Sequence, residues 1–194
     1  QTGQLPENTS HCVVGWDLRP SSPAIAGAVY AGLRAEGLQA DWAGCLPTPA
    51  LALRALQTGS PGIMVTGSHI PFDRNGIKFN RIDGEVLKPD EQGIRAQDVV
   101  LPDLFDEAGM LKDAGSAEPL VDAATAYIAR YVDHFGPTAL AGMKLGVYEH
   151  SAVGRDIVAT LVEQLGGKAV RLGRSDRFIP VDTEAVRPED QALA

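Results

Sequence analysis

The sequence is poor in cysteine, in aromatic residues and in positive charge. Only two cysteines, Cys12 and Cys45, occur in 194 residues, and aromatic residues make up 6% of the chain. These two thiols have neither the spacing of metal ligands nor the density of a secreted disulfide scaffold. The sequence therefore predicts a protein of the reducing cytoplasm, in which both cysteines are small core residues.

Acidic residues outnumber basic ones, 25 against 17, and the net charge is −8. This balance disfavours binding to nucleic acid or to an anionic membrane surface. No long uninterrupted apolar run is present, so we expect no membrane-spanning helix. Residues 1–6 lack the positive and apolar regions of a signal peptide. Glycine-rich nucleotide-binding loops are also missing, which disfavours ATP and NAD as cofactors.

The chain contains the ingredients of a globular α/β protein. Hydrophobic residues make up 44% of it, and strand-like apolar segments alternate with helix-like ones. The alternation predicts a layered α/β domain with a mixed, largely parallel sheet, followed by part of a second, similar domain. Ser22 and Thr48 each precede a proline, a pattern in which the first residue is the N-cap of a helix. The expected strands include 12–15, 39–43, 62–65, 77–79, 144–148 and 168–172, and further helices pass through 127–131 and 161–165.

An acidic stretch, residues 90–118, separates the two expected domains. It holds eight acidic residues, against Arg95 and Lys112 as its basic ones. Such a charge run is typical of a solvated surface. We interpret the stretch as a solvated helix plus a connection, and we predict one domain over residues 1–115 and a second over 119–194.

The most informative run of residues extends from Thr66 to Lys78 and follows the expected strand 62–65. Open α/β sheets bind ligands at the carboxyl ends of their strands, so Ser68 is expected to be presented there. A serine hydroxyl is a weak nucleophile that needs a neighbouring base or cation. His69 and Lys78 are the local candidates, because strand alternation places Lys78 on the opposite face from its two apolar neighbours.

Plainer interpretations of this run stay open. Serine and histidine commonly stabilise tight surface loops through hydrogen bonds, and Lys78 is then a solvated strand residue. A serine hydrolase is disfavoured, because Ser68 does not lie in a Gly-x-Ser-x-Gly elbow.

Two other groups of polar residues attract attention. Asp17 and Arg19 lie where the first strand meets its helix, a place that suits either an anion site or a structural salt bridge. His150, Ser151 and Arg155 occupy the corresponding turn of the second domain, where we expect a structural cap. Three arginines lie around the end of the last strand, at a spacing that favours solvent-facing charge over phosphate binding: Arg171, Arg174 and Arg177.

The run around Ser68 resembles the active-serine loop of the α-D-phosphohexomutase superfamily, the phosphoglucomutases and phosphomannomutases. The commonest form of that loop is Thr-Ala-Ser-His-Asn-Pro, followed by Asn-Gly and a lysine. The matching residues here are Ser68, His69, Pro71, Asn75, Gly76 and Lys78. Gly67 and Ile70 depart from the pattern, and Trp16 stands where the family often has arginine. The variant Thr-Gly-Ser-His-Ile-Pro is similar to that of bacterial phosphomannomutase-like members.

The resemblance implies an intramolecular phosphotransferase, an isomerase of carbohydrate metabolism. In that family the phosphoserine, here Ser68, passes its phosphoryl group to a hexose phosphate, and the bound bisphosphate returns the other group. The resemblance also implies His69 as an assisting acid or base and Lys78 as a general base or charge stabiliser. Arg19 would be a cation beside the phosphate of the substrate or phosphoserine.

The same resemblance implies Mg²⁺ as cofactor and hexose 1,6-bisphosphate as activator. Ser68 would supply one metal ligand through its phosphate, and an Asp-Gly-Asp-x-Asp-Arg loop the others; no such loop occurs in residues 1–194. We therefore expect a portion of a four-domain enzyme that lacks the first strand, ends before the metal loop and is inactive alone. A phosphoglucosamine mutase and a non-catalytic sugar-phosphate-binding or scaffold protein stay open as alternatives, as does the oligomeric state.

Overall fold

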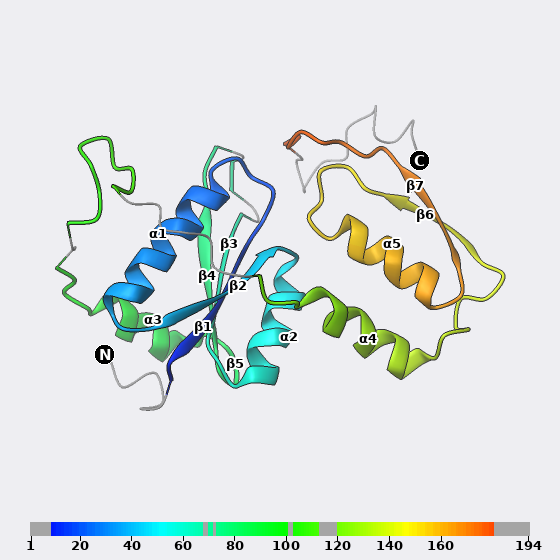
Figure 1. The fold of residues 1–194 in the computed structure, drawn as a ribbon, viewed down its shortest axis with the longest axis horizontal. Helices are drawn as coiled ribbons and strands as arrows, with labels where there is room; N and C mark the ends of the chain where they lie inside the picture. Colours follow the sequence, from blue (N-terminus) through cyan, green and yellow to red (C-terminus); the bar gives the residue numbers. More distant parts are fainter. Residues whose placement is uncertain (1–8, 68–69, 72, 101–102, 113–119, 181–194) are drawn as a thin grey trace.

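Two β-sheets, each with helices packed against it, form the computed structural model, which describes residues 9–67, 70–71, 73–100, 103–112 and 120–180 (Figure 1). The first sheet has the strand order β2-β1-β3-β4-β5. Its parallel strands are β1 (His11–Trp16), β2 (Gln39–Cys45) and β3 (Gly62–Thr66). β4 (Gly76–Arg81) and β5 (Gly84–Glu85) run antiparallel to their neighbours. The predicted mixed α/β sheet is confirmed.

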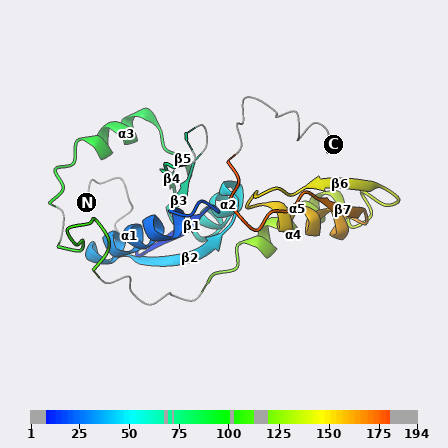
Figure 2. The same ribbon diagram turned by 90° about the horizontal axis from the view of Figure 1, so that it is seen from above.

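Helices cover both faces of this sheet. α1 (Ser22–Ala35) and α2 (Thr48–Thr58) pack on opposite faces because alternate strand residues point opposite ways. Cys12 and Val14 contribute to a core that includes residues of α1, whereas Val13 contributes to a core that includes residues of α2. A third helix, α3 (Lys88–Arg95), has no buried residue and stands apart from the sheet in Figure 2. This agrees with the solvated helix expected in the acidic stretch.

Both predicted helix starts are displaced by one residue. The N-cap of α1 is Ser21, and Ser22 is already helical. Ser22 is fully buried, and its hydroxyl donates a hydrogen bond to Asp17, the residue after β1, instead of capping the helix. In α2 the N-cap is Pro47, and Thr48 begins the helix. α1 ends before Gly37, whose φ of 76° lies in the left-handed region that glycine tolerates best.

The second sheet consists of β6 (Lys144–Tyr148) and β7 (Lys168–Leu172), which are parallel. Both strands have the predicted bounds. α5 (Arg155–Gln164) packs against this sheet, and α4 (Ala124–Phe135) packs against both α2 and α5. In Figure 1, α4 accordingly runs between the two halves of the molecule. The predicted division at residues 115–119 lies largely outside the described residues and stays a prediction.

The two cysteines differ in their surroundings. Cys12 is buried in β1, as predicted, but Cys45 is exposed, so its assignment to the core was wrong. Cys45 is the last residue of β2, which is an edge strand and therefore has a neighbouring strand on one side only. Within the described residues, no helix is both long enough and apolar enough to cross a membrane.

Candidate active site

Asp17 and Gly67 meet at the carboxyl edge of the first sheet. β1 and β3 are parallel neighbours, and Trp16 pairs with Val65 near their ends. The backbone N–H of Asp17 donates to the carbonyl oxygen of Val65 at 3.0 Å, which extends the pairing beyond β1. The residue that precedes Ser68 therefore lies beside Asp17, at the edge where ligands of α/β sheets bind.

The Asp17 carboxylate accepts five hydrogen bonds and is only 8% exposed. One oxygen, Oδ1, accepts from the Ser22 hydroxyl at 2.5 Å and from the Arg19 backbone N–H at 3.0 Å. The other, Oδ2, accepts from Arg19 Nη1 at 2.5 Å, Thr66 Oγ1 at 3.0 Å and Gly67 N–H at 3.3 Å. Burial alone raises the pKa of Asp17, but these hydrogen bonds outweigh it and hold the pKa below its ordinary value. The carboxylate is therefore ionised and joins β1, α1 and the start of the serine loop.

Arg19 is buried between Asp17 and the loop. Its guanidinium Nη1 donates to the Gly67 carbonyl oxygen at 3.1 Å as well as to Asp17. Its Cζ lies 5.5 Å from the ring centroid of Phe178, within cation–π range. Arg19 Nε is buried and has no hydrogen-bond partner among the described residues. The structural salt bridge considered from the sequence thus exists, and its arginine also contacts Gly67, the residue before Ser68 in the chain.

The glycine at position 67 has a steric cause in this structure. A Cβ placed there would lie 2.5 Å from the Cζ of Arg19, far inside van der Waals contact. The commonest form of the resembling loop has alanine at this position. With Arg19 where it lies, only glycine fits.

The far end of the loop is held by α1. Asn75 Nδ2 donates to the hydroxyls of Ser21 at 2.8 Å and Ser22 at 2.9 Å. The Arg74 backbone N–H donates to the Pro71 carbonyl oxygen at 3.0 Å, which closes a turn within the loop. Contacts from the turn after β1 therefore fix Gly67, and contacts from the start of α1 fix Asn75. These two residues lie on either side of Ser68 in the chain.

Of the predicted catalytic residues, Ser68 and His69 lie outside the described residues. Lys78 is exposed in β4 and pairs in register with Met64 of β3. It stands on the face opposite to Ile77 and Phe79, as the alternation predicts. Lys78 forms no hydrogen bond or ion pair with the described part of the chain, and its role stays a prediction.

Comparison with known proteins agrees with this geometry. Residues 2–97 match the family model for phosphoglucomutase/phosphomannomutase, alpha/beta/alpha domain I. The chain is 43% identical to a phosphomannomutase of Salmonella muenchen over 92% of its own length, and 45% identical to one of Sinorhizobium fredii over 90%. The chain belongs to the phosphohexomutase superfamily.

Other members are more distant. A phosphoglucosamine mutase of Pectobacterium atrosepticum is 36% identical over 83% of the chain and 36% of its own length. The crystal structure of a phosphoglucomutase/phosphomannomutase family protein from Burkholderia thailandensis superposes with a TM-score of 0.66 at 30% identity, over 86% of this chain and 36% of that one. The chain spans 36% of the length of the two phosphomannomutases it matches.

The turn between β6 and α5, which contains His150 and Ser151, binds the segment that follows β7. His150 has a φ of 46°, unusual for a residue with a side chain, and is only 9% exposed. The Ser151 hydroxyl accepts a hydrogen bond from the Ile179 N–H at 3.0 Å, and Arg155 Nη1 donates to the Ser175 carbonyl oxygen at 2.5 Å. The turn therefore has a structural role, with the segment after β7 as its partner. The expected cap was wrong, because the N-cap of α5 is Gly154 and no side chain caps the helix.

Two of the three predicted solvent-facing arginines are already paired. Arg171 donates to Glu149 at 2.8 Å and to Asp156 at 2.6 Å, and Arg174 donates to Asp156 at 2.8 Å. The hydrogen bonds from Arg174 and Arg171 lower the pKa of Asp156 to about 2. Glu149 is itself fully buried. This network neutralises its own charges and leaves no net positive site for a phosphate.

The described residues do not make a metal site. Among them, no group of three or more His, Cys, Asp or Glu side chains is placed to hold a metal ion. The implied Mg²⁺ ligands are thus not found among the described residues.

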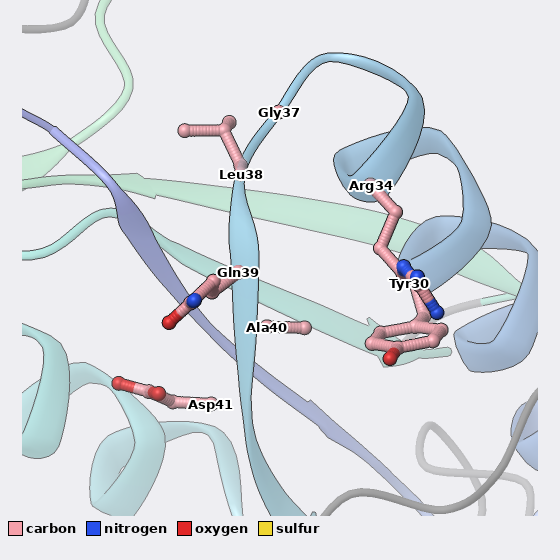
Figure 3. A pocket seen from close by; sticks show the side chains of 7 residues that line it. All are labelled: Tyr30, Arg34, Gly37, Leu38, Gln39, Ala40 and Asp41. Atoms are coloured by element: carbon pink, nitrogen blue, oxygen red, sulfur yellow. The ribbon is translucent and has the colours of Figure 1, made fainter.

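A hollow of about 480 Å³ lies at the opposite edge of the first sheet (Figure 3). It is formed where α1 ends and β2 begins, and its lining residues are Tyr30, Arg34, Gly37, Leu38, Gln39, Ala40 and Asp41. The serine loop follows the carboxyl end of β3, so this hollow is separate from it. The carboxyl end of a helix carries partial negative charge, which disfavours a phosphate in the hollow.

Proposed function

We propose that this chain provides the phosphoserine loop of a phosphohexomutase that interconverts hexose 1-phosphate and hexose 6-phosphate, with mannose or glucose as the sugar. The observation that carries the proposal is the fixation of the residues flanking Ser68, at Gly67 and at Asn75. Phosphoryl transfer depends mainly on positioning and on charge stabilisation, which a loop held at both ends favours.

In the proposed reaction, phosphoserine 68 donates its phosphoryl group to the free hydroxyl of the bound hexose phosphate. The bond between phosphorus and serine oxygen breaks, a bond to the sugar oxygen forms, and a hexose bisphosphate results. The Ser68 oxygen then attacks the other phosphorus of the reoriented bisphosphate, and the bond from that phosphorus to the sugar oxygen breaks. The serine proton passes to a base, and the freed sugar oxygen takes up a proton. Lys78 or His69 is the base, and Arg19 stabilises charge beside the phosphoserine.

The substrate assignment rests on the relatives. The two phosphomannomutases are 43% and 45% identical to the chain, against 36% for the phosphoglucosamine mutase. Mannose and glucose phosphates are therefore the first substrates to test, and glucosamine phosphate is the comparison. A cytoplasmic location, dependence on Mg²⁺ and activation by hexose 1,6-bisphosphate belong to the same proposal.

The test is made on the full-length gene product, incubated with hexose 1,6-bisphosphate and digested. Tandem mass spectrometry is expected to find the phosphoryl group on Ser68. Coupled assays are expected to show turnover of mannose 1-phosphate or glucose 1-phosphate, and Ser68→Ala should abolish it. Ser60→Ala, at a buried serine before β3, is the control for the effect of losing a hydroxyl.

Phosphate on a residue other than Ser68 would contradict the nucleophile assignment. Tight binding of a hexose phosphate without phosphorylation or turnover would favour the non-catalytic alternative. Preference for glucosamine 1-phosphate would favour the alternative that the protein is a phosphoglucosamine mutase.

A further inference from the structure

The Arg19 guanidinium is held on two sides. Its edge donates to Asp17 and to the Gly67 carbonyl oxygen, at 2.5 and 3.1 Å. Its Cζ lies over the Phe178 ring, 5.5 Å from the ring centroid. An aromatic ring attracts a cation through its π face and takes up none of the guanidinium's hydrogen-bond donors. Phe178 thus contacts the cation that donates to the residue before Ser68 in the described structure.

Phe178 reaches Arg19 from the other half of the molecule. It lies in the segment after β7, which runs from the second sheet toward the first in Figures 1 and 2. Sequence patterns do not connect these two residues, because nothing local to Phe178 marks it as a partner of the serine loop.

The segment is tied down on both sides of Phe178. Before it, the Ser175 N–H donates to the His150 carbonyl oxygen at 3.0 Å, and Arg155 donates to the Ser175 carbonyl oxygen. After it, the Ile179 N–H donates to the Ser151 hydroxyl at 3.0 Å. The backbone on both sides of Phe178 is therefore held by the turn that precedes α5, which places the ring near Arg19.

The backbone of that turn is itself unusual. His150 adopts a φ of 46°, a conformation that costs a residue with a side chain about 1 kcal/mol or more. Arg155 Nη1 donates to the His150 carbonyl oxygen at 3.0 Å and stabilises this geometry. A strained residue kept in place by its neighbours indicates that the position of the segment it holds matters.

From these contacts we infer that Phe178 is a positioning residue for phosphoryl transfer. It fixes the Arg19 guanidinium against the Gly67 carbonyl and excludes water from its face, so that the charge stays directed at the serine loop. The inference rests on the proposed mutase activity, since the role of Phe178 is exerted through Arg19 and through no contact with the sugar.

The test compares Phe178→Leu with Phe178→Tyr in the full-length gene product. Leucine keeps an apolar side chain but has no π face, whereas tyrosine keeps the face. A cation–π contact of this kind corresponds to a fall in kcat of about 2- to 30-fold for Phe178→Leu. We expect KM for the hexose phosphate to change less than about twofold, and Phe178→Tyr to keep kcat within about twofold. Phe135→Leu, at an exposed phenylalanine of α4 whose ring contacts His134, is the matched control.

A second measurement does not need turnover. Hydrogen exchange of the Arg19 Nε–H, followed by NMR with labelled arginine, is expected to accelerate at least several-fold in Phe178→Leu and not in Phe178→Tyr. In an Arg19→Gln background, which has no charge at this position, Phe178→Leu should change kcat by less than about twofold, because the coupled partner is already gone.

The outcomes separate the inference from the proposed function. An inactive wild-type protein refutes the proposed function. Unchanged exchange of the Arg19 Nε–H in Phe178→Leu refutes the inference, whether or not the protein is active. An active enzyme in which leucine and tyrosine have equal effects on kcat, or in which KM rises with kcat unchanged, also overturns the positioning role.

Discussion

Asp17→Asn is expected to destabilise the first sheet strongly, because one buried carboxylate accepts five hydrogen bonds there. Asparagine keeps the shape of the side chain, but its nitrogen cannot accept. If the nitrogen replaces Oδ1, the Ser22 hydroxyl and one backbone N–H lose their acceptor. If it replaces Oδ2, three donors lose theirs. In both orientations the Arg19 charge, 8% exposed, loses its counter-ion.

The magnitude follows from the cost of a buried charge without a partner. Removing one member of a buried ion pair costs about 3–5 kcal/mol. The Gly67 carbonyl and the Phe178 ring still contact Arg19 and offset part of this cost. We therefore expect the free energy of unfolding of the first sheet to fall by about 3 kcal/mol at pH 7.

Urea denaturation followed by tryptophan fluorescence measures this change selectively. Both tryptophans lie in the first sheet, where the Trp16 and Trp42 rings are 5.1 Å apart. Asp133→Asn, at an exposed position of α4, is the control and should change the free energy by less than about 0.5 kcal/mol. A loss below about 1 kcal/mol for Asp17→Asn would refute the reasoning that this carboxylate joins β1 to the serine loop.

The effect also has a defined pH dependence. The folded-state pKa of Asp17 is lowered, so the carboxylate stabilises the fold above its unfolded-state pKa of about 4. That contribution is lost as the pH falls through the folded-state pKa. The difference in stability between the wild type and Asp17→Asn should therefore narrow below about pH 4.

Three further predictions concern other parts of the chain. Gly67→Ala places a Cβ against the Arg19 guanidinium and should cost about 1–3 kcal/mol of stability, most of it absent in an Arg19→Ala background; an additive double mutant would contradict this. NMR titration of Asp156 should give a midpoint near pH 2 that rises in Arg174→Gln, whereas a midpoint unaffected by the arginine would disprove the pairing. Burial, and after it the charge of a nearby aspartate, raises the pKa of the Cys12 thiol to about 12. Alkylation of Cys12 by iodoacetamide at pH 8 should therefore be slow until urea unfolds the protein, and rapid labelling of the native state would show that the thiol is reachable.

Local patterns in the sequence were sufficient for most of the secondary structure. β6 and β7 have the predicted bounds, because each is a short apolar run closed by turn residues. The serine loop follows β3 as expected, since Gly62–Thr66 has the continuous apolar pattern of a buried strand. The start of α1 was displaced by one residue because the Ser22 hydroxyl donates to Asp17 and does not cap the helix. The start of α2 was also displaced by one residue, with Pro47 as its N-cap.

The site was predicted less completely than the strands. The residue types around Ser68 and their spacing predicted the loop, and the structure brings Arg19 into contact with Gly67. The catalytic roles of Ser68, His69, Lys78 and Arg19 stay predictions. The salt bridge between Asp17 and Arg19 was among the expectations, but the hydrogen bonds from Thr66 and Gly67 to Asp17, the anchoring of Asn75 by Ser21 and Ser22, and the contact of Phe178 with Arg19 were not foreseen. Each of these unforeseen contacts joins residues far apart in the chain, such as Asp17 and Gly67, which are separated by 50 positions.

The sequence by itself determined which segments become strands and helices, and that a serine loop of the phosphohexomutase type follows a buried strand. These properties depend on neighbouring residues and on the spacing of apolar side chains, both of which can be read along the chain. Only the tertiary structure decided that β1 lies beside β3, and hence that Asp17 and Arg19 close on Gly67. Strand order and domain packing arise from contacts between distant segments, so the surroundings of Ser68 were decided by the fold and not by the local sequence.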